Sequence, residues 1–324
     1  MFRIARPCLR QGGKKARNGD ADVPRPAKQQ TAGVYQRACI GGHVSAYNRT
    51  KLFIPLVFII FSAAPRLDAD TIRVFSFNIQ IFGKAKMAKP DVVNILADIV
   101  SLADVIAIQE VRTADIEPVE HFMRSLPARY AYVIGPREGR GSSKEQYWII
   151  YDTDKARVLA TDTWSDPEDI FERNPFAVFF QTRDKFDFII IDNHIQPGNA
   201  DREINALPQV VDYYRREWQE PDILLVGDFN ADGSYYDERL LREVFPPEQY
   251  RIVITDEYDT SVAPSENTYD RIIITSAAAE DYAEKSGVLR FDELYAFDQF
   301  PIRPRDVSDH YPVWAEFHTD ADTD

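Results

Sequence analysis

Residues 222–232 read DILLVGDFNAD, a short apolar run that stops at a glycine and is followed by Asp228 and Asn230. Such a run, bounded by turn residues, predicts a buried β-strand over Asp222–Gly227. The two polar side chains would then lie just beyond the end of the strand, where a rigid element can aim them into a cleft. The stretch therefore predicts both a sheet and a site at its edge.

The same arrangement recurs along the chain. Polar residues that can bind metal or phosphate lie at the ends of other predicted strands, namely Asn78, Glu110, His194, Asp270 and the pair Asp309-His310. Any one of these residues is as well explained as a turn residue, because Asn and Asp favour turns. Six strand ends that carry such residues favour one shared site instead.

Strands and helices are predicted without a break after residue 70. Helices are expected from Pro90, with one apolar face, and over Ala200–Trp218, whose apolar stripe has helical spacing; the face after Pro90 comprises Val93, Leu96, Ile99, Val100 and Ala103. Strands are expected over Thr71–Asn78, Asp104–Gln109, Gln146–Tyr151, Phe176–Thr182, Phe186–Asn193, Asp222–Gly227, Tyr269–Thr275 and Pro312–Phe317. We expect one α/β domain in which two sheets pack face to face with helices outside.

Charge is distributed unevenly over the 324 residues. The first 64 residues carry +9 (11 basic, two acidic) and the rest carry −23 (27 basic, 50 acidic), which gives −14 for the chain. A domain this acidic binds nucleic acid poorly by charge alone, which argues against a protein that coats DNA. A nuclease stays open, because clustered carboxylates hold metal ions and a small basic patch can still contact phosphates.

The N-terminal region differs from the rest. Residues 1–50 are rich in Arg, Lys, Gly, Ala and Gln without apolar periodicity, which predicts disorder or an extension ahead of a true start near Val44. Residues 51–69 combine a basic residue, a short apolar run and small residues, which predicts a signal peptide. A buried first strand is the alternative. Residues 70–319 would form the domain and 320–324 an acidic tail.

Three local strings are specific: GDFNAD (Gly227–Asp232), SDHYPV (Ser308–Val313) and IQEV (Ile108–Val111). With these, and with the segment from His194 to Leu207, the sequence resembles the endonuclease/exonuclease/phosphatase superfamily and, within it, the DNase I family. The resemblance runs from about Ile72 to Phe317. It implies a four-layer α/β/β/α sandwich (DNase I-like) with its site where the edges of the two sheets meet.

The resemblance also implies an acid/base pair. His194 and His310 would exchange protons with water and with the leaving oxygen, because imidazole titrates near neutral pH. Each ring needs a carboxylate that fixes its tautomer. The family pattern pairs Glu145 with His194 and Asp270 with His310.

The remaining site residues would act on the phosphate and on a metal ion. The resemblance implies that Asp228 and Asn230 position the attacking water and bind the transition state. It assigns a divalent ion to Asn78, Glu110 and Asp309. Oxygen ligands beside a phosphate suit Mg²⁺, with Mn²⁺ as the alternative.

Substrate contacts are implied for four basic residues that match DNA-facing positions of the family, namely Arg112, Arg140, Lys144 and Arg173. Ordinary solvated surface is an equal alternative for each. Ser143 stands where the family's minor-groove tyrosine is expected, so affinity and sequence preference would differ from those of the family.

The disulfide of the family is absent. Gly233 and Asn267 occupy the positions where it is often found. The two cysteines of the chain, Cys8 and Cys39, both lie in the N-terminal extension, so the domain itself would contain no disulfide and no cysteine-based metal site.

The calcium loops of the family are only partly kept. Asp259, Ser261 and Asp169 could still bind the ion, whereas Ala263 and Asn174 stand where ligands are expected. Fewer charged ligands mean weaker binding. We therefore expect Ca²⁺ binding to be weak or absent.

Other functions stay open on the same motifs. A sphingomyelinase or a phosphoinositide phosphatase would share nearly the same catalytic set, although a sphingomyelinase should carry an aromatic membrane-docking hairpin, which the sequence lacks. A non-catalytic binding module should have lost some of Glu110, His194, Asp228 and His310, and all four are present. We expect a secreted or periplasmic monomer that acts on DNA and has no stable membrane association after signal cleavage.

Overall fold

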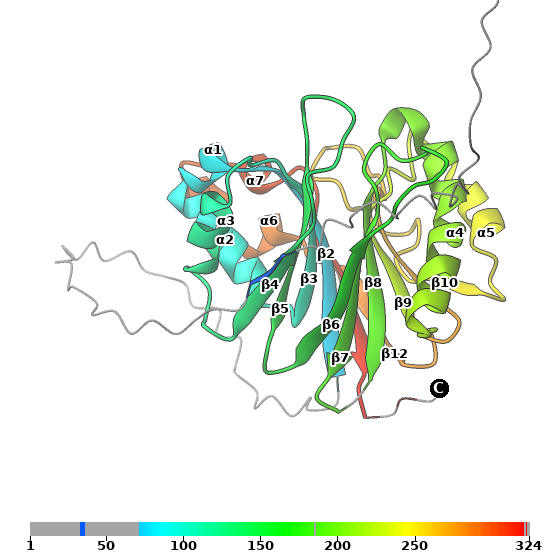
Figure 1. Ribbon diagram of the computed structural model, residues 1–324. Helices are drawn as coiled ribbons and strands as arrows, with labels where there is room; N and C mark the ends of the chain where they lie inside the picture. The colour runs from blue at the N-terminus through cyan, green and yellow to red at the C-terminus, as the bar shows by residue number, and fades with distance from the viewer. Residues whose placement is uncertain (1–32, 36–70, 185, 321, 323–324) are drawn as a thin grey trace, which may run out of the picture. The chain divides into compact units, whose positions relative to one another are not determined.

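The computed structural model describes residues 33–35, 71–184, 186–320 and 322 of the chain, and their strands form two mixed sheets (Figure 1). The seven-stranded sheet has the order β1 (Gly33–Tyr35), β4 (Tyr130–Ile134), β5 (Gln146–Asp152), β3 (Val105–Val111), β2 (Thr71–Phe82), β13 (Val313–His318) and β12 (Tyr282–Val288). The six-stranded sheet has the order β10 (Tyr250–Ile252), β11 (Asp270–Thr275), β9 (Ile223–Asp228), β8 (Asp187–His194), β7 (Phe176–Thr182) and β6 (Ala156–Thr163).

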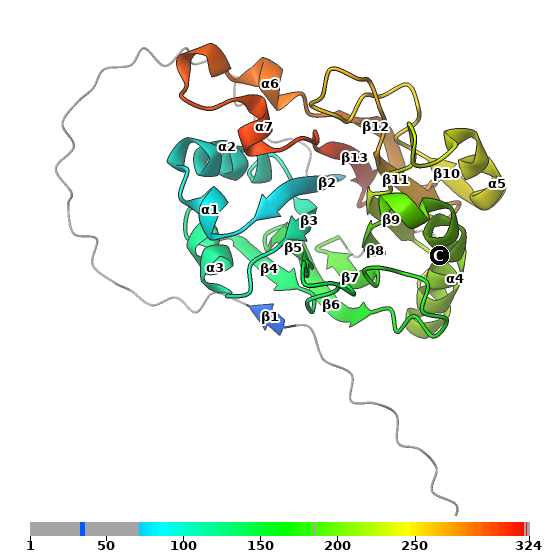
Figure 2. The same ribbon diagram turned by 90° about the horizontal axis from the view of Figure 1, so that it is seen from above.

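Helices cover the outer face of each sheet (Figures 1 and 2). Apolar side chains of α2 (Pro90–Val100) and α3 (Glu117–Met123) pack on the first sheet, and those of α4 (Ala200–Trp218) and α5 (Leu241–Val244) pack on the second. A third apolar cluster, which includes Val74, Val105, Phe188 and Leu224, fills the space between the sheets. The four-layer α/β/β/α sandwich is therefore confirmed.

The remaining helical elements are short. They are the helices α1 (Lys84–Met87), α6 (Phe291–Leu294) and α7 (Pro304–Val307), and the 3₁₀ turns η1 (Pro197–Asn199), η2 (Glu238–Leu240) and η3 (Phe297–Gln299). In Figure 2, α1 and α7 both lie beside α2, next to the end of β2. Of these, η1 begins three residues after His194, and α7 ends three residues before His310.

Parallel pairing brings the ends of four strands to one edge. β2 pairs in parallel with β3, and β8 pairs in parallel with β9, while the other pairs of described strands are antiparallel. The register places Asn78 beside Gln109 in the first sheet and His194 beside Asp228 in the second. His194 and Asp228 are the last residues of β8 and β9. Asn78 and Glu110, which were expected just beyond strand ends, lie within β2 and β3 instead, because these strands continue to Phe82 and Val111.

Most predicted elements are confirmed, but one helix face differs. The helix α4 has the predicted bounds and buries the predicted stripe despite an internal proline at position 208. In α2 the residues packed on the sheet include Val92 and Ile95, whereas Val93, which was expected there, is only partly buried. Strands β1, β4, β6, β10 and β12 were not predicted. β1 and β10 have only three residues each, and β12 (YAEKSGV) has no apolar alternation.

The extension expected at residues 1–50 and the signal peptide expected at 51–69 lie outside the described residues, apart from the three residues of β1, which pair with β4. Of the expected tail at 320–324, residues 320 and 322 are described. Within the described part of the chain, no helix is both long and apolar enough to cross a membrane.

Candidate active site

Asp228 lies at the centre of the site, at the end of β9. The Nε2 atoms of His194 and His310 lie 3.5 and 3.6 Å from its Oδ2, which also accepts a hydrogen bond of 2.9 Å from the side-chain amide of Asn78. Burial opposes the charge of Asp228, but the two histidines and the Asn78 amide outweigh it and lower the pKa of the carboxyl group. One buried carboxylate thus joins residues from both sheets.

Gly227 allows β9 to come this close to β8. Its φ of +134° is rarely adopted by other residues, and a Cβ atom there would lie 1.9 Å from the carbonyl oxygen of Asn193. The glycine of the GDFN string is therefore required for backbone packing. It sets the position of Asp228 against His194, its neighbour in the register.

His310 forms a pair with Asp270, the first residue of β11. Its Nδ1 lies 2.8 Å from Asp270 Oδ2, and the carboxylate is fully buried. Burial disfavours the charged ring, but Asp270 and Asp228 together outweigh it and raise the pKa of His310 to about 10. The predicted pairing of these two residues is present, and the ring of His310 lies between the carboxyl groups of Asp270 and Asp228.

His194 forms the second pair, with Glu145. Its Nδ1 lies 2.8 Å from Glu145 Oε2, while Arg112 contacts Glu145 Oε1 at 2.8 Å. Arg173 lies 3.7 Å from the same oxygen and donates through Nε to the carbonyl of His194 at 2.9 Å. Burial opposes the charge of Glu145, but the His194 hydrogen bond and the two arginines lower its pKa to about 2.

The residues expected to bind metal lie beside these pairs. The side-chain amide of Asn78 donates to Glu110 at 3.3 Å as well as to Asp228, and its side-chain oxygen Oδ1 accepts from the backbone of Gln80. Glu110 also contacts Arg112 at 3.2 Å. Glu110 and Asp309 are both partly buried, and their carboxylate oxygens are the kind of ligand that a hard divalent ion such as Mg²⁺ prefers.

Backbone strain marks two of the site residues. Glu110 has a φ of +63° and Asn230 a φ of +48°. Asn adopts this left-handed conformation fairly often, whereas Glu rarely does. A backbone held in such a region costs about 1–3 kcal/mol, and residues of this kind cluster at functional sites. The side chain of Asn230 donates to the carbonyl of Ile195 at 2.9 Å, so it supports the segment that follows His194.

Among the described residues, a tighter cluster of potential metal ligands is Asp228, Asp270 and His310, whose ligand atoms all lie within 4.8 Å of one another. It differs from the expected set of Asn78, Glu110 and Asp309. Because Asp270 and His310 already share a short hydrogen bond, the cluster is better explained as part of the acid/base machinery than as a metal centre.

The basic residues expected to contact DNA have different surroundings. Arg112 and Arg173 lie inside the site, next to Glu145. Arg140 donates to Asp169 Oδ1 at 2.9 Å and to the carbonyls of Asp169 and Phe171, so its guanidinium holds a loop. Lys144 is exposed at the rim of the same loop region.

Two residues near the site were missed by sequence reasoning. The hydroxyl of Tyr147 accepts a hydrogen bond of 2.9 Å from the backbone of His194, and the ring of Tyr269 lies 6.1 Å from that of His310. Tyr269 directly precedes Asp270 in the TYDRIII string, so its position was a usable signal. Tyr147 offers none, because its contact crosses 47 residues between the two sheets.

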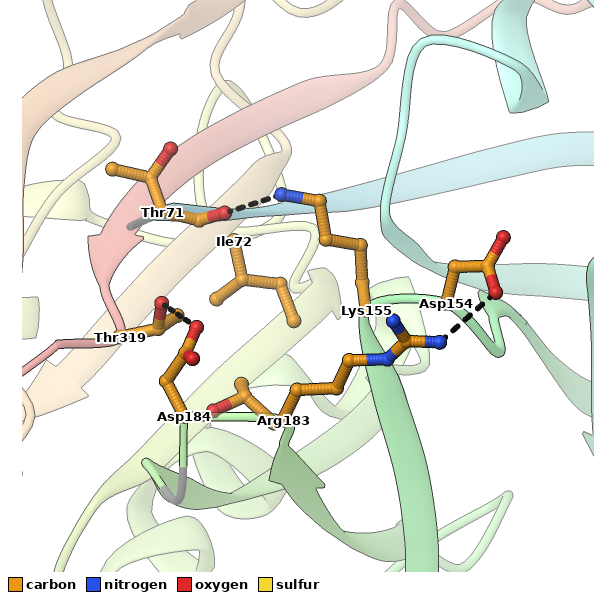
Figure 3. A pocket seen from close by; sticks show the side chains of 8 residues that line it. Thr71, Ile72, Asp154, Lys155, Arg183, Asp184 and Thr319 are labelled. Atoms are coloured by element: carbon orange, nitrogen blue, oxygen red, sulfur yellow. Dashed lines mark hydrogen bonds and ion pairs between the residues drawn. The ribbon is translucent and has the colours of Figure 1, made fainter. Parts of the chain in front are cut away.

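A separate cavity of about 260 Å³ is lined by the start of β2 and by the turns after β5 and β7 (Figure 3). It is lined by Thr71, which begins β2, whereas Asn78 lies seven residues further along, or roughly 23 Å in an extended strand. Its charged groups pair with their neighbours: Arg183 contacts Asp154 at 3.0 Å and Lys155 donates to the carbonyl of Thr71 at 3.2 Å. This cavity is therefore no part of the candidate site.

Comparison with known proteins agrees with this geometry. The model of the endonuclease/exonuclease/phosphatase family matches residues 75–310. The chain is 33% identical to deoxyribonuclease-1-like 2 of Mus musculus over 264 residues, covering 78% of this chain and 94% of that protein. It is 34% identical to deoxyribonuclease-1 of Gallus gallus over 281 residues, covering 80% of this chain and 96% of that protein.

Solved structures share the fold. An endonuclease/exonuclease/phosphatase family protein from Bacteroides thetaiotaomicron superposes with a TM-score of 0.59 at 17% identity, covering 76% of this chain and 95% of that one. A mannosyl-6-phosphatase of the same organism superposes with a TM-score of 0.55 at 17% identity, covering 75% and 98%. At this identity the likeness concerns the fold alone.

Proposed function

Since this chain belongs to the DNase I family of the endonuclease/exonuclease/phosphatase superfamily, we propose that it is a metal-dependent endonuclease that hydrolyses phosphodiester bonds of DNA. One observation carries the proposal. Two histidines, each oriented through Nδ1 by a carboxylate at 2.8 Å, present their Nε2 atoms to the same side chain, Asp228. This is the arrangement that a reaction with one proton accepted and one donated requires.

The two histidines take different roles. His310 lies between the carboxylates of Asp270 and Asp228, which favour the imidazolium, so it is the group that protonates the leaving oxygen. His194 then accepts the proton of the attacking water, with Glu145 stabilising the imidazolium that forms. A new bond forms between the water oxygen and phosphorus as the bond to the leaving oxygen breaks, and Asp228 and Asn230 orient the water.

Glu110, Asp309 and Asn78 would hold Mg²⁺, with Mn²⁺ as the alternative. A bound divalent ion would polarise the phosphoryl oxygens and offset the charge of the transition state. Arg112, Arg173, Arg140 and Lys144 are proposed to face the DNA backbone, Arg112 and Arg173 also serving as partners of Glu145. A phosphatase or sphingomyelinase on the same fold is the second candidate, since a mannosyl-6-phosphatase has this architecture.

Purified protein incubated with plasmid DNA, RNA or sphingomyelin, in Mg²⁺, in Mn²⁺ or with EDTA, tests the proposal. Plasmid should be cleaved with either metal and be left intact with EDTA. His194→Ala and His310→Ala should each lower the rate by about 10²–10⁴-fold. His121→Ala, which changes an exposed histidine of α3, is the control and should be fully active. A fully active His310→Ala protein would contradict the mechanism.

We also propose that residues 51–69 direct export and are removed, which leaves a secreted or periplasmic monomer without stable membrane association. N-terminal sequencing of the exported protein should give a start within or just after this segment, and size-exclusion chromatography with light scattering should give one chain. A mature protein that starts at Met1 would contradict the export proposal.

A further inference from the structure

Arg290, between β12 and α6, connects a surface loop to the segment that carries His310. Its guanidinium lies 3.3 Å from Asp259 Oδ2 and 4.4 Å from the ring centre of Tyr311, which directly follows His310. It also contacts Asp292 at 3.5 Å. The side chain thus links Asp259 with Tyr311 although 52 residues separate them in the sequence.

The loop from Asp259 to Thr268 contacts the backbone on both sides of His310. Val262 donates to the carbonyl of Asp309 at 2.8 Å, and Tyr311 donates to the carbonyl of Thr260 at 2.7 Å. Ser261 and His310 form a β-bridge between these two bonds. A shift of the loop would therefore move His310.

The same loop also supports the partner of His310. The hydroxyl of Thr260 accepts hydrogen bonds from the backbone of Tyr269 at 3.0 Å and of Asp270 at 3.2 Å. Both members of the Asp270–His310 pair consequently depend on where Thr260 and Ser261 lie. The conformation of the loop is a condition for the 2.8 Å contact within that pair.

Asp259 is the residue that folds the loop. Its Oδ1 accepts from the backbone of Ser261 at 3.0 Å and of Asn267 at 3.3 Å, which ties the two ends of the loop together. Its Oδ2 contacts Arg290. Both oxygens of the carboxylate are therefore engaged, and the negative charge is neutralised by a guanidinium.

The loop leaves few free ligand atoms for a calcium ion, which the family resemblance implies here, because both oxygens of Asp259 are already engaged. The hydroxyl of Ser261 accepts a hydrogen bond from the backbone of Ala263, and Ala263 has no ligand atom in its side chain. The surrounding cavity of about 680 Å³ is strongly acidic. Of the described residues that line it, five are acidic, namely Asp232, Asp256, Glu257, Asp259 and Glu266, and Arg290 alone is basic.

We propose that Arg290 is a positioning residue for His310. Its guanidinium binds Asp259 where a metal ion would otherwise bind, and it packs on the ring of Tyr311. These two contacts fix the loop and thereby keep His310 at hydrogen-bond distance from Asp270. The proposal rests on the proposed function only for the role of His310 in catalysis. The part that concerns loop structure stands on the contacts of Arg290 alone.

Arg251 offers a matched control. It pairs with Glu284, and its guanidinium lies 4.6 Å from the ring centre of Tyr282, a contact of the same kind as that of Arg290 with Tyr311. The two arginines are also similarly exposed, 38% for Arg290 and 42% for Arg251. Arg251 lies in β10, however, and none of its contacts reaches the segment around His310.

The experiment compares Arg290→Gln, Arg290→Lys and Arg251→Gln in the full chain. Arg290→Gln should lower kcat by about ten- to a hundredfold with little change in KM, because a small misplacement of a reacting group is enough for such a loss. Arg290→Lys, which keeps the charge, should recover part of the rate. Methylguanidinium added to Arg290→Gln should restore more activity than it does in Arg251→Gln, and millimolar Ca²⁺ should not replace it.

Hydrogen exchange provides a readout that does not depend on catalysis. The amides of Val262 and Tyr311 should exchange faster in Arg290→Gln than in wild type, and should be unchanged in Arg251→Gln. Equal kcat and equal exchange in the two glutamine variants would overturn the proposal. If His310→Ala is inactive but the two glutamine variants have equal kcat and equal exchange, this inference is refuted and the proposed function stands. If His310→Ala is active, the proposed function is refuted, and the exchange rates of Val262 and Tyr311 alone test the loop contact.

Discussion

The side-chain amide of Gln109 in β3 donates a hydrogen bond of 2.6 Å to Oδ1 of Asp192 in β8, across the space between the two sheets. Both side chains are fully buried. Gln109 directly precedes Glu110, and Asp192 lies two residues before His194. The bond therefore connects the strand that carries Glu110 in one sheet to the strand that carries His194 in the other. Burial raises the pKa of Asp192 well above its ordinary value, although Gln109 acts against this shift.

Asp192→Asn should therefore stabilise the protein at neutral and alkaline pH. A carboxyl group whose pKa is raised in the folded state costs nothing below the unfolded pKa of about 3.9, and the cost grows as pH rises toward the folded pKa. The variant carries no such charge, so it should gain about 1–3 kcal/mol at pH 8 and nothing at pH 3.5. Urea unfolding between pH 3.5 and 9 measures this, and parallel pH dependence of the two proteins would contradict it.

Glu145→Gln should lower kcat by about 10²–10⁴-fold, because the imidazolium of His194 would lose its carboxylate partner. Glu316→Gln is a matched control, since Glu316 is equally buried and also contacts two cations, Arg73 and Lys285, away from the site. Both variants should melt at lower temperature, and Glu145→Gln alone should lose activity. Equal activity losses would mean that Glu145 serves stability and not His194.

Cleavage should weaken steeply with salt, and Lys144→Ala should flatten that dependence. Each phosphate contact contributes a log–log slope of about −0.9 for duplex DNA, so the variant should lose roughly one such increment. Arg183→Ala, beside the cavity of Figure 3, is the control. Arg112→Ala should lower kcat as well, because Arg112 contacts Glu110 and Glu145. An unchanged slope in Lys144→Ala would remove Lys144 from the interface.

Reducing agent and calcium should each change the melting temperature little. Residues 65–324 contain no cysteine, and Gly233 and Asn267, at the family's disulfide positions, lie against each other without one. Asp259 and Asp169 contact Arg290 and Arg140, which leaves less charge for an added ion. Thermal melts with and without dithiothreitol and millimolar Ca²⁺ check both points. A large rise with Ca²⁺ would show that Asp259, Ser261 and Asp169 still form a binding site.

Local sequence patterns were enough to predict the main elements and most of the site residues. Apolar periodicity predicted α4 and the main strands, because burial of a helical stripe or of a short apolar run is a local property of the chain. Local strings such as GDFNAD also pointed to Asp228, since the glycine that allows the close approach of β8 and β9 is its neighbour in sequence. The family resemblance added the pairing of Glu145 with His194.

The partners of the charged side chains could be read from the folded chain alone, because they come from distant parts of the sequence. The sequence motifs assign Arg140 to the DNA backbone and Asp259 to a calcium loop, and the structure adds that each side chain contacts a partner more than 25 residues away. Such contacts depend on loop conformation and strand register, which no local pattern encodes. Arg290 had no sequence signal at all. Its proposed role rests on its contacts with Asp259 and Tyr311, two residues 52 positions apart that only the fold brings to one guanidinium.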